Sequence, residues 1–353
     1  MKNAILTFHS VPNFGAFLQT YALYKSILNI TDEVEIIDYE PNFIKENYNP
    51  YRIDYSDFFK SSIKILLYSR DKKKKIMIFK EFLQKHLTLS SKKVSTKEEL
   101  KKLCQQYPII ICGSDQIWNS EITNYDNSYF LPFNLDNTKK CSYAASFGNE
   151  NINYQSECLT YLKDFKYISV REKQSAEKIN SVCSFNAKTH VDPTLLLRKD
   201  EWNQLASNRV VDKPYLLIYV VKQPKELIDY AINFAKKNNL EIIQLSDIKK
   251  RREIKYVKNV NPSEFLMYFR DASYIFTNSF HGTVFSIIFQ KEYFIELISL
   301  DGSTNTRSQS LLKELDLEVS SINKKINWSE IEKRVANQRE ESINYLKEIN
   351  NRF

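Results

Sequence analysis

The 353-residue sequence predicts an α/β protein of two domains, and three observations support this prediction. The chain is longer than one hydrophobic core comfortably serves. Short apolar runs alternate with segments of helical periodicity in both halves. Several apolar runs lead directly into polar loops that contain a glycine, which is where an α/β protein places its ligand loops.

Glycine is scarce in this chain. There are only five, where average usage would give about 25. Four lie in loops that resemble sites: Gly15, Gly113, Gly148 and Gly282. Because other residues serve elsewhere, these four should mark backbone with positive φ or a close approach to the main chain. The fifth, Gly302, fits an ordinary turn.

The first half of the chain opens with a strand, a loop, a helix and a second strand, a βαβ unit. We expect the strands at Ala4 to Phe8 and Val34 to Ile37, with the helix at Ala16 to Leu28 between them. The segment from Tyr48 to Leu89 predicts two helical pieces that separate near a lysine run. Thr96-x-x-Glu99 is a capping box that begins another helix.

Three further apolar runs predict buried strands in this half. They are Ile109 to Cys112, Ser142 to Ser146 and Tyr167 to Val170. Ser169-x-x-Glu172 resembles a second capping box and would place Arg171 in the first turn of a helix. A strand also ends before Pro193, because proline cannot continue a central strand.

The second half repeats the same alternation after a polar junction at about 198–213. Its predicted strands are Tyr215 to Val221, Glu241 to Leu245, Tyr274 to Thr277 and Tyr293 to Leu297. Its predicted helices run from Lys225 to Lys236, from the capped start at Asn261, from His281 or Gly282, and from Ser329 to Asn350. We therefore predict domains at 1–197 and 198–327 and a closing helix at 328–353 that packs on the first domain.

The composition narrows the classes of partner and compartment. The formal net charge is +8, which a solvated lysine-rich surface explains as well as an anionic partner does. The basic runs at 72–75 and 249–252 lack interleaved aromatic residues, so we expect no nucleic-acid partner. The first run is compatible with peripheral contact with an anionic membrane surface.

We expect a cytoplasmic protein, because no secretory signal or membrane-spanning run is visible. The five cysteines form no C-x-x-C pair, which indicates free thiols in a reducing compartment. None of the four histidines stands in ligand spacing with a cysteine, so we expect no metal site.

The loop from Asn278 to Thr283 carries the clearest chemical signal. A buried strand leads into a helix start, whose N–H groups and positive dipole end form an anion site. Ser279 and Thr283 add hydroxyl donors, and Gly282 lies in the turn. His281 adds a group that can hold or move a proton near neutral pH. The alternative is a structural histidine that caps the helix.

The loop after the strand at Ile109 to Cys112 is the counterpart in the first half. Asp115 and Gln116 suit sugar hydroxyls, and Trp118 offers a flat face for a pyranose. The alternative is a helix cap by Ser114 or Asp115, with Trp118 in the core. The two interpretations have equal weight.

A dinucleotide site is not expected after the first strand. The loop from His9 to Gly15 lacks the G-x-G-x-x-G pattern. Asp38, at the end of the second strand, would be the ribose acid of a dinucleotide fold, but without that loop it does not indicate NAD.

Two arginines are candidates for binding a carboxylate or phosphate. Arg171 lies at a strand–helix junction, and its alternative is an ion pair with Glu172 or its neighbours. Arg307 opens a helix after a polar loop and is the weaker candidate.

Taken in order, these motifs resemble the polysaccharide pyruvyl transferase family, over roughly Ala4 to Leu312. The motifs are Asn13-Phe14-Gly15-Ala16, Ile37-Asp38-Tyr39-Glu40-Pro41, Gly113-Ser114-Asp115-Gln116-Ile117-Trp118-Asn119, Ser142-Tyr143-Ala144-Ala145-Ser146-Phe147-Gly148, Ile168-Ser169-Val170-Arg171-Glu172, Asp192-Pro193-Thr194-Leu195-Leu196 and Thr277-Asn278-Ser279-Phe280-His281-Gly282-Thr283.

The resemblance implies a GT-B-like fold, in which two Rossmann-like domains face a cleft and a C-terminal helix returns to the first domain. It also implies phosphoenolpyruvate as donor, a sugar of a surface polysaccharide or its lipid-linked precursor as acceptor, a ketal product and no cofactor. The expected proton-transfer group is His281, with Asp115 as base or hydroxyl orienter.

The resemblance also sorts the binding residues. The expected donor-binding residues are Arg171, Ser279, Gly282, Thr283, Arg307 and Lys222. The expected acceptor-binding residues are Asn13, Phe14, Gly15, Ser114, Gln116 and Trp118. Some family members have an arginine where this chain has Ser279, so another cation, such as Lys222, must replace it.

Two rival functions remain at this point. A GT-B glycosyltransferase that uses a nucleotide sugar would need the same helix end. A non-catalytic carbohydrate-binding protein of capsule assembly would need the loops but not the proton transfer.

Overall fold

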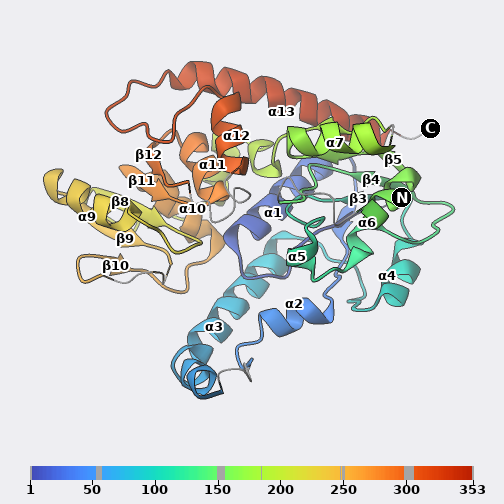
Figure 1. The fold of residues 1–353 in the computed structure, drawn as a ribbon, viewed down its shortest axis with the longest axis horizontal. Coiled ribbons are helices and arrows are strands. Elements are labelled where there is room, and N and C mark those ends of the chain that lie inside the picture. Colours follow the sequence, from blue (N-terminus) through green and yellow to red (C-terminus); the bar gives the residue numbers. More distant parts are fainter. Residues whose placement is uncertain are drawn as a thin grey trace. The chain divides into compact units, whose positions relative to one another are not determined.

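The computed structural model describes residues 2–52, 58–148, 156–183, 185–246, 248, 251–297 and 306–351. The chain forms two compact units, Met1–Leu196 with Gln338–Phe353, and Leu197–Asn337. Each unit has a parallel five-stranded sheet (Figure 1). Gly302 lies outside the described residues, as do positions 249 and 250 of the second basic run.

The sheet of the first unit has the strand order β2-β1-β3-β4-β5. All neighbouring strands are parallel. The strands are β1 (Asn3–Leu6), β2 (Val34–Ile36), β3 (Ile109–Cys112), β4 (Lys139–Ser142) and β5 (Phe165–Tyr167). Because the strand order reverses direction between β1 and β3, the carboxyl ends of these two strands form the switch point at which open α/β sheets bind ligands.

A short second sheet and several helices complete the first unit. The sheet pairs β6 (Ser169–Val170) with β7 (Lys188–Thr189). The helices are α1 (Phe14–Leu28), α2 (Asn42–Asn47), α3 (Phe58–His86), α4 (Lys97–Cys104), α5 (Ser120–Thr123), α6 (Ser156–Tyr161) and α7 (Lys173–Cys183), with 3-10 turns η2 (Asn127–Phe130), η4 (Leu162–Asp164) and η5 (Pro193–Leu195).

The second unit has the strand order β10-β9-β8-β11-β12, again all parallel. Its strands are β8 (Tyr215–Tyr219), β9 (Glu241–Gln244), β10 (Lys255–Tyr256), β11 (Tyr274–Thr277) and β12 (Glu292–Ile295). Its helices are α8 (Lys199–Leu205), α9 (Leu227–Lys237), α10 (Pro262–Asp271), α11 (Phe280–Ile288) and α12 (Thr306–Glu314). This is the dinucleotide-fold order, and its switch point lies between β8 and β11.

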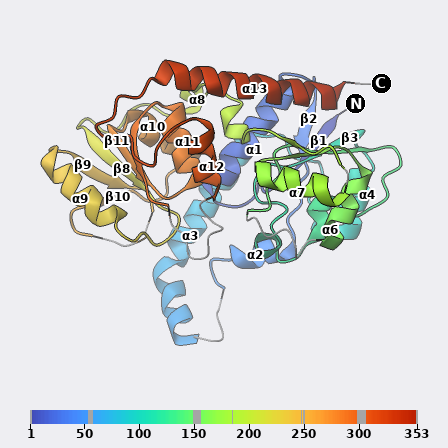
Figure 2. The same ribbon diagram turned by 45° about the horizontal axis from the view of Figure 1, so that its top comes forward.

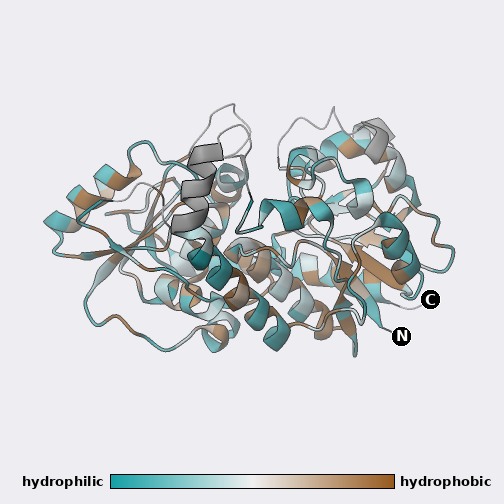
Figure 3. Cartoon of the chain, turned by 90° about the horizontal axis from the view of Figure 1, so that it is seen from below, coloured by the Kyte–Doolittle hydropathy of each residue, from teal (hydrophilic) through white to brown (hydrophobic). Residues whose placement is uncertain are grey.

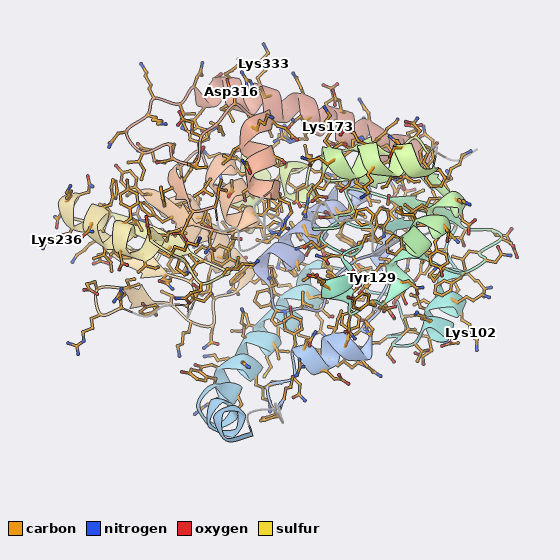
Figure 4. The ribbon with its side chains drawn as sticks, in the orientation of Figure 1. Lys102, Tyr129, Lys173, Lys236, Asp316 and Lys333 are labelled. Atoms are coloured by element: carbon orange, nitrogen blue, oxygen red, sulfur yellow. The ribbon has the colours of Figure 1, made fainter. Side chains whose placement is uncertain are left out.

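The sheets are apolar because helices cover them. Brown, hydrophobic residues gather on the strands of the first unit, and teal residues line the outer helices (Figure 3). Tyr129, labelled in Figure 4, is fully buried in the first unit, with its ring centroid 5.1 Å from that of Phe8. Lys102, Lys173, Lys236 and Lys333 point outward from their helices in the same view. These four lysines therefore contribute to a solvated surface, as one interpretation of the net charge expects.

The last helix, α13 (Trp328–Asn350), joins both units along the chain. Its final turns belong to the first unit, where Leu346 and Ile349 are fully buried. The hydroxyl of Tyr345 donates to the carbonyl of Ser142 at 3.0 Å, and Nε of Arg339 donates to the carbonyl of Leu195 at 2.7 Å. Apolar burial and these two bonds fix the end of the helix to the first sheet.

Four local predictions were wrong, and two were confirmed. The helix over the lysine run is one continuous α3, which extends away from the rest of the first unit (Figure 2). The capping box at Ser169 is absent, because that hydroxyl bonds His190 and the next helix begins at Lys173.

Two element boundaries also differ from the prediction. The strand expected from Ser142 to Ser146 ends at Ser142, and the helix expected from Ala16 begins at Phe14. The boxes at Thr96 and Asn261 are confirmed.

We predict that Leu346→Ala destabilises the protein by about 2–5 kcal/mol, because it leaves a cavity where α13 packs on the first unit. Lys347→Ala, at the exposed neighbouring position, is the matched control and should change stability little. Chemical denaturation measures both variants. Equal effects of the two substitutions would contradict the packing of this helix end.

Candidate active site

Predicted loops of the first unit meet at its switch point. The backbone N–H of Gly113, after β3, donates to the carbonyl of Leu6, at the end of β1, at 3.0 Å. The hydroxyl of Thr7 donates to the carbonyl of Ser114 at 2.9 Å. The loops that follow β1 and β3 are therefore held against each other at the carboxyl edge of the sheet.

Asp115 occupies a strained position at this edge. Its φ is 69°, which is uncommon for a residue other than glycine and is frequent at functional sites. Its carboxylate accepts from the N–H of Gln116 at 2.8 Å, and its carbonyl accepts from the N–H of Ser146 at 3.0 Å. The residue is partly exposed, so the carboxylate can reach a ligand.

Gly148 is needed to bring the loop after β4 close to Asp115 and Gln116. Its φ is 76°, and a Cβ at this position would overlap the side-chain amides of Gln116 and Asn119. These two side chains bond each other at 2.9 Å. The prediction that glycine marks special backbone is confirmed here and at Gly113, where φ is 126°.

The start of α1 does not match that prediction. Gly15 lies inside the helix and does not have positive φ. Asn13 caps the helix, with its side-chain oxygen accepting from the N–H of Ala16 at 3.2 Å. Phe14 is buried, with its ring centroid 5.1 Å from that of Phe79 in α3. Only Asn13 of these three expected acceptor residues presents a polar side chain at the loop.

Trp118 lies in the core of the first unit and is 1% exposed. Its ring stacks on Phe130 at 5.0 Å, and its N–H donates to the carbonyl of Tyr129 at 3.1 Å. The core alternative therefore describes this residue, and neither face of the indole is open to a sugar. Ser114 is also fully buried and donates to the carbonyl of Ala144.

Arg171 is buried between two carboxylates. Its Nε donates to Glu172 at 3.2 Å and its terminal nitrogen donates to Asp192 at 2.8 Å. Burial acts to lower the pKa of Arg171, but the charges of Glu172, Asp192 and Asp115 outweigh it and raise the pKa above its ordinary value. The ion-pair alternative describes the contacts seen here. Binding of the donor by Arg171 stays a prediction, and the two carboxylates oppose it.

The loop after β11 lies at the carboxyl edge of the second sheet, as the loop after β3 does in the first sheet. Ser279 caps α11 and accepts from the N–H of Gly282 at 3.4 Å. The hydroxyl of Thr283 donates to the carbonyl of Ser279 at 3.1 Å and lies 3.4 Å from the hydroxyl of Ser308 in α12. The first turns of α11 and α12 are therefore neighbours, and both place positive dipole ends in this region.

Gly282 permits a close approach between α11 and β11. A Cβ there would overlap the hydroxyl oxygen of Thr277. That hydroxyl donates to the carbonyl of Tyr219 at 2.6 Å and accepts from the N–H of Ser279 at 3.0 Å. The missing side chain thus lets one threonine join the ends of β8 and β11 to the start of α11.

His281 and Arg307 both contact Phe280. The His281 ring centroid is 5.1 Å from that of Phe280, and the Arg307 guanidinium lies 5.4 Å from the same ring. His281 is 8% exposed. An imidazole and a guanidinium beside two helix starts can together hold an anion and move a proton.

Lys222 follows β8 on the other side of the switch point. The amide of Asn278 donates to the carbonyl of Lys222 at 2.9 Å and accepts from the N–H of Val221 at 2.9 Å. Asn278 therefore joins the two loops, and the exposed Lys222 side chain belongs to the same edge as Ser279.

Two arrangements were not predicted from the sequence. His9 and Asp38 form a buried pair at 3.1 Å across the ends of β1 and β2. Glu296, after β12, accepts from the N–H groups of Lys225, Glu226 and Leu227 at 3.1, 2.7 and 2.9 Å. The carboxylate therefore occupies the start of α9. In both arrangements the interacting residues lie far apart in the sequence, so no local motif could have revealed them.

The described part of the chain contains no group of three or more histidine, cysteine and acidic residues that could hold a metal ion. Of the described helices, none is long and apolar enough to cross a bilayer.

Two Rossmann-like parallel-sheet units, each with polar loops at its switch point, are typical of a GT-B type fold, and solved structures agree. The S. aureus MnaA–UDP co-structure matches with a TM-score of 0.54 and 10% identity, over 99% of this chain and 91% of that chain. The UDP-GlcNAc 2-epimerase from Neisseria meningitidis, bound to UDP-GlcNAc, matches with a TM-score of 0.52 and 9% identity, over 99% and 94%. At such identities the likeness shows the fold alone, and the predicted fold class is confirmed.

The family described as polysaccharide pyruvyl transferase matches residues 13–294. The chain therefore belongs to the polysaccharide pyruvyl transferase family. No curated protein sequence matches it.

We predict that Arg171→Met destabilises the protein by about 3–5 kcal/mol, because it leaves buried carboxylates without their counter-charge. Adding Asp192→Asn to Arg171→Met should recover part of that loss, because one of the carboxylates is then neutral. Urea denaturation measures both variants. If Arg171→Met were as stable as wild type, the ion pairs would not support this edge of the sheet.

Proposed function

We propose that the protein transfers a pyruvyl group from phosphoenolpyruvate to two hydroxyls of a sugar in a surface polysaccharide or its lipid-linked precursor. The product is a cyclic ketal, and phosphate is released. Membership of the family supports this proposal most directly. The polar and charged groups at the two switch points support donor binding by the second unit and acceptor binding by the first.

The second unit suits the donor. Phosphoenolpyruvate carries about two to three negative charges near neutral pH, since the second phosphate pKa is about 6. The starts of α11 and α12, the guanidinium of Arg307 and the side chain of Lys222 supply positive potential. Ser279 and Thr283 stabilise the first turn of α11 by hydrogen bonds within it, and Gly282 allows that turn to pack against β11. Together these groups replace the arginine that some family members have at position 279.

The first unit suits the acceptor. Asn13, Asp115 and Gln116 present oxygen and amide groups at the switch point, and carboxylates accept hydrogen bonds from hydroxyls. Its buried Arg171 is surrounded by acidic groups, so the local charge is unfavourable for a second anion. We therefore assign Arg171 a positioning role beside the acceptor loops and leave donor binding to the second unit.

The reaction balances without a cofactor. One sugar hydroxyl forms a bond to the C2 carbon of phosphoenolpyruvate while the methylene carbon gains a proton and becomes methyl. The bond from C2 to the phosphate oxygen then breaks, and the second hydroxyl closes the ketal. The two sugar hydroxyls lose two protons in total. One is offset by the proton gained at the methyl group, and the other leaves with the released phosphate. His281 is the proton donor to carbon in this scheme, and Asp115 receives a hydroxyl proton or orients that hydroxyl.

Two other functions need different chemistry. A nucleotide-sugar glycosyltransferase would bind a diphosphate. It would bind that diphosphate at the same start of α11, so calorimetry with phosphoenolpyruvate and with UDP-GlcNAc distinguishes it from the proposed function. A non-catalytic carbohydrate-binding protein would not need an imidazole beside an anion site. His281 beside the helix start therefore favours a catalytic function over carbohydrate binding alone.

The cellular setting follows from the proposed acceptor. We propose a cytoplasmic enzyme of capsule or exopolysaccharide synthesis. Contact with the inner face of the membrane through the lysine run, of which Lys72, Lys73 and Lys74 are exposed on α3, stays a prediction. Co-sedimentation with phosphatidylglycerol vesicles is the measurement that tests it.

We predict that His281→Gln lowers kcat by on the order of 10²–10⁴-fold, because general acid catalysis contributes about this much. Calorimetry should show that the variant still binds phosphoenolpyruvate, whereas UDP-GlcNAc gives no heat with either protein. His86→Gln, on α3, is the matched control and should remain active. Unchanged turnover in His281→Gln, or tight UDP-GlcNAc binding without a response to phosphoenolpyruvate, would overturn the proposal.

A further inference from the structure

The buried pair of His9 and Asp38 is not used by the reaction scheme above. His9 follows β1, Asp38 follows β2, and the His9 side chain is 1% exposed. Nδ1 of His9 lies 3.2 Å from the carbonyl of Thr7, and Nε2 lies 3.1 Å from Oδ1 of Asp38. A carbonyl oxygen and a carboxylate oxygen are both acceptors, so each ring nitrogen of His9 faces one acceptor.

The backbone of Asp38 is fixed as firmly as its side chain. Its N–H donates to the hydroxyl of Ser90 at 2.9 Å, and its carbonyl accepts from the N–H of Val94 at 2.9 Å. The Asp38 side chain is 16% exposed, so it reaches the surface although its imidazole partner does not. Burial acts to raise the pKa of Asp38, but the hydrogen bond from His9 and the charges of His9, Lys93 and Lys80 prevail, and the pKa is lowered.

His9 also links Asp38 to the acceptor loops. The carbonyl of Thr7 accepts from His9, and the hydroxyl of Thr7 donates to the carbonyl of Ser114. One continuous set of contacts therefore crosses the carboxyl ends of β2, β1 and β3. In dinucleotide folds, an acidic residue at the end of the second strand binds ribose hydroxyls. The present chain has the acid without the glycine-rich loop that would bring a dinucleotide to it.

We propose that Asp38 binds a hydroxyl pair of the acceptor sugar and that His9 is the positioning residue that sets the direction of its carboxylate. Oδ1 is paired with His9, and among the described residues no hydrogen bond or ion pair to Oδ2 is found. This oxygen accepts from the sugar, while the contact between the buried imidazole and Oδ1 holds the carboxylate in one rotamer. The inference rests on the proposed acceptor side of the first unit, and it names a residue and a contact beyond that proposal.

The experiment measures sugar binding in the absence of phosphoenolpyruvate, so its result does not depend on donor binding. Saturation-transfer NMR is recorded with methyl glycosides of galactose, mannose, glucose and N-acetylglucosamine. We expect wild type to bind at least one of them and Asp38→Asn to weaken that binding by roughly ten-fold or more, because the charged hydrogen bonds are lost. Asp32→Asn, exposed on the loop before β2, is the matched control and should bind as wild type does.

His9→Gln separates positioning from direct contact. It should weaken glycoside binding less than Asp38→Asn, and the double variant should bind no more weakly than Asp38→Asn, because His9 acts through Asp38. With an active acceptor, Asp38→Asn should raise the acceptor KM and leave the phosphoenolpyruvate KM unchanged. Unchanged glycoside binding in Asp38→Asn, additive losses in the double variant, or no glycoside bound by wild type would each overturn the inference. If Asp38→Asn does not fold, unchanged binding in His9→Gln overturns it instead.

Discussion

Burial of the strands is the constraint on which this structure depends. The central strands of both sheets are apolar and almost fully enclosed, so they have no room for reactive polar groups along their length. Polar side chains can gather only where the strands end. Because all strands in a sheet are parallel, their carboxyl ends meet at one edge, and the reversal of strand order separates the loops there. The position of the chemistry therefore follows from the topology, and the identity of the loop residues decides what that chemistry is.

The two edges carry opposite electrostatic character. In the first unit Asp115, Glu172 and Asp192 surround one arginine, which leaves an excess of carboxylates that suits neutral, hydroxyl-rich ligands. In the second unit His281 lies at the start of α11, and both His281 and Arg307 contact Phe280, so the positive potential there suits an anion. The same principle explains Glu296, because a carboxylate of the chain itself satisfies the N–H groups at the start of α9. The proposed division between acceptor and donor is thus argued from the charges of each unit taken by itself.

The sequence was most informative where a single local rule decides the structure. The apolar run at Ile109–Cys112 and the capping boxes at Thr96 and Asn261 are such cases. It was misleading where distant partners compete for a side chain. Ser169 bonds His190 in place of capping a helix, and Trp118 is enclosed by Phe130 and Phe147 in place of facing a ligand. The pairs His9–Asp38 and Arg171–Asp192 join residues from loops that follow different strands, so only the fold could reveal them.

The central claim is that a proton is delivered to the methylene carbon of phosphoenolpyruvate while a sugar diol takes its pyruvyl group. The most direct test is turnover with phosphoenolpyruvate and an active glycoside in D2O, followed by mass spectrometry and NMR of the product. The account predicts a pyruvyl ketal whose methyl group carries one deuterium, formed together with an equal amount of phosphate. A ketal without deuterium in its methyl group, or sugar transfer without phosphate release from phosphoenolpyruvate, would contradict it.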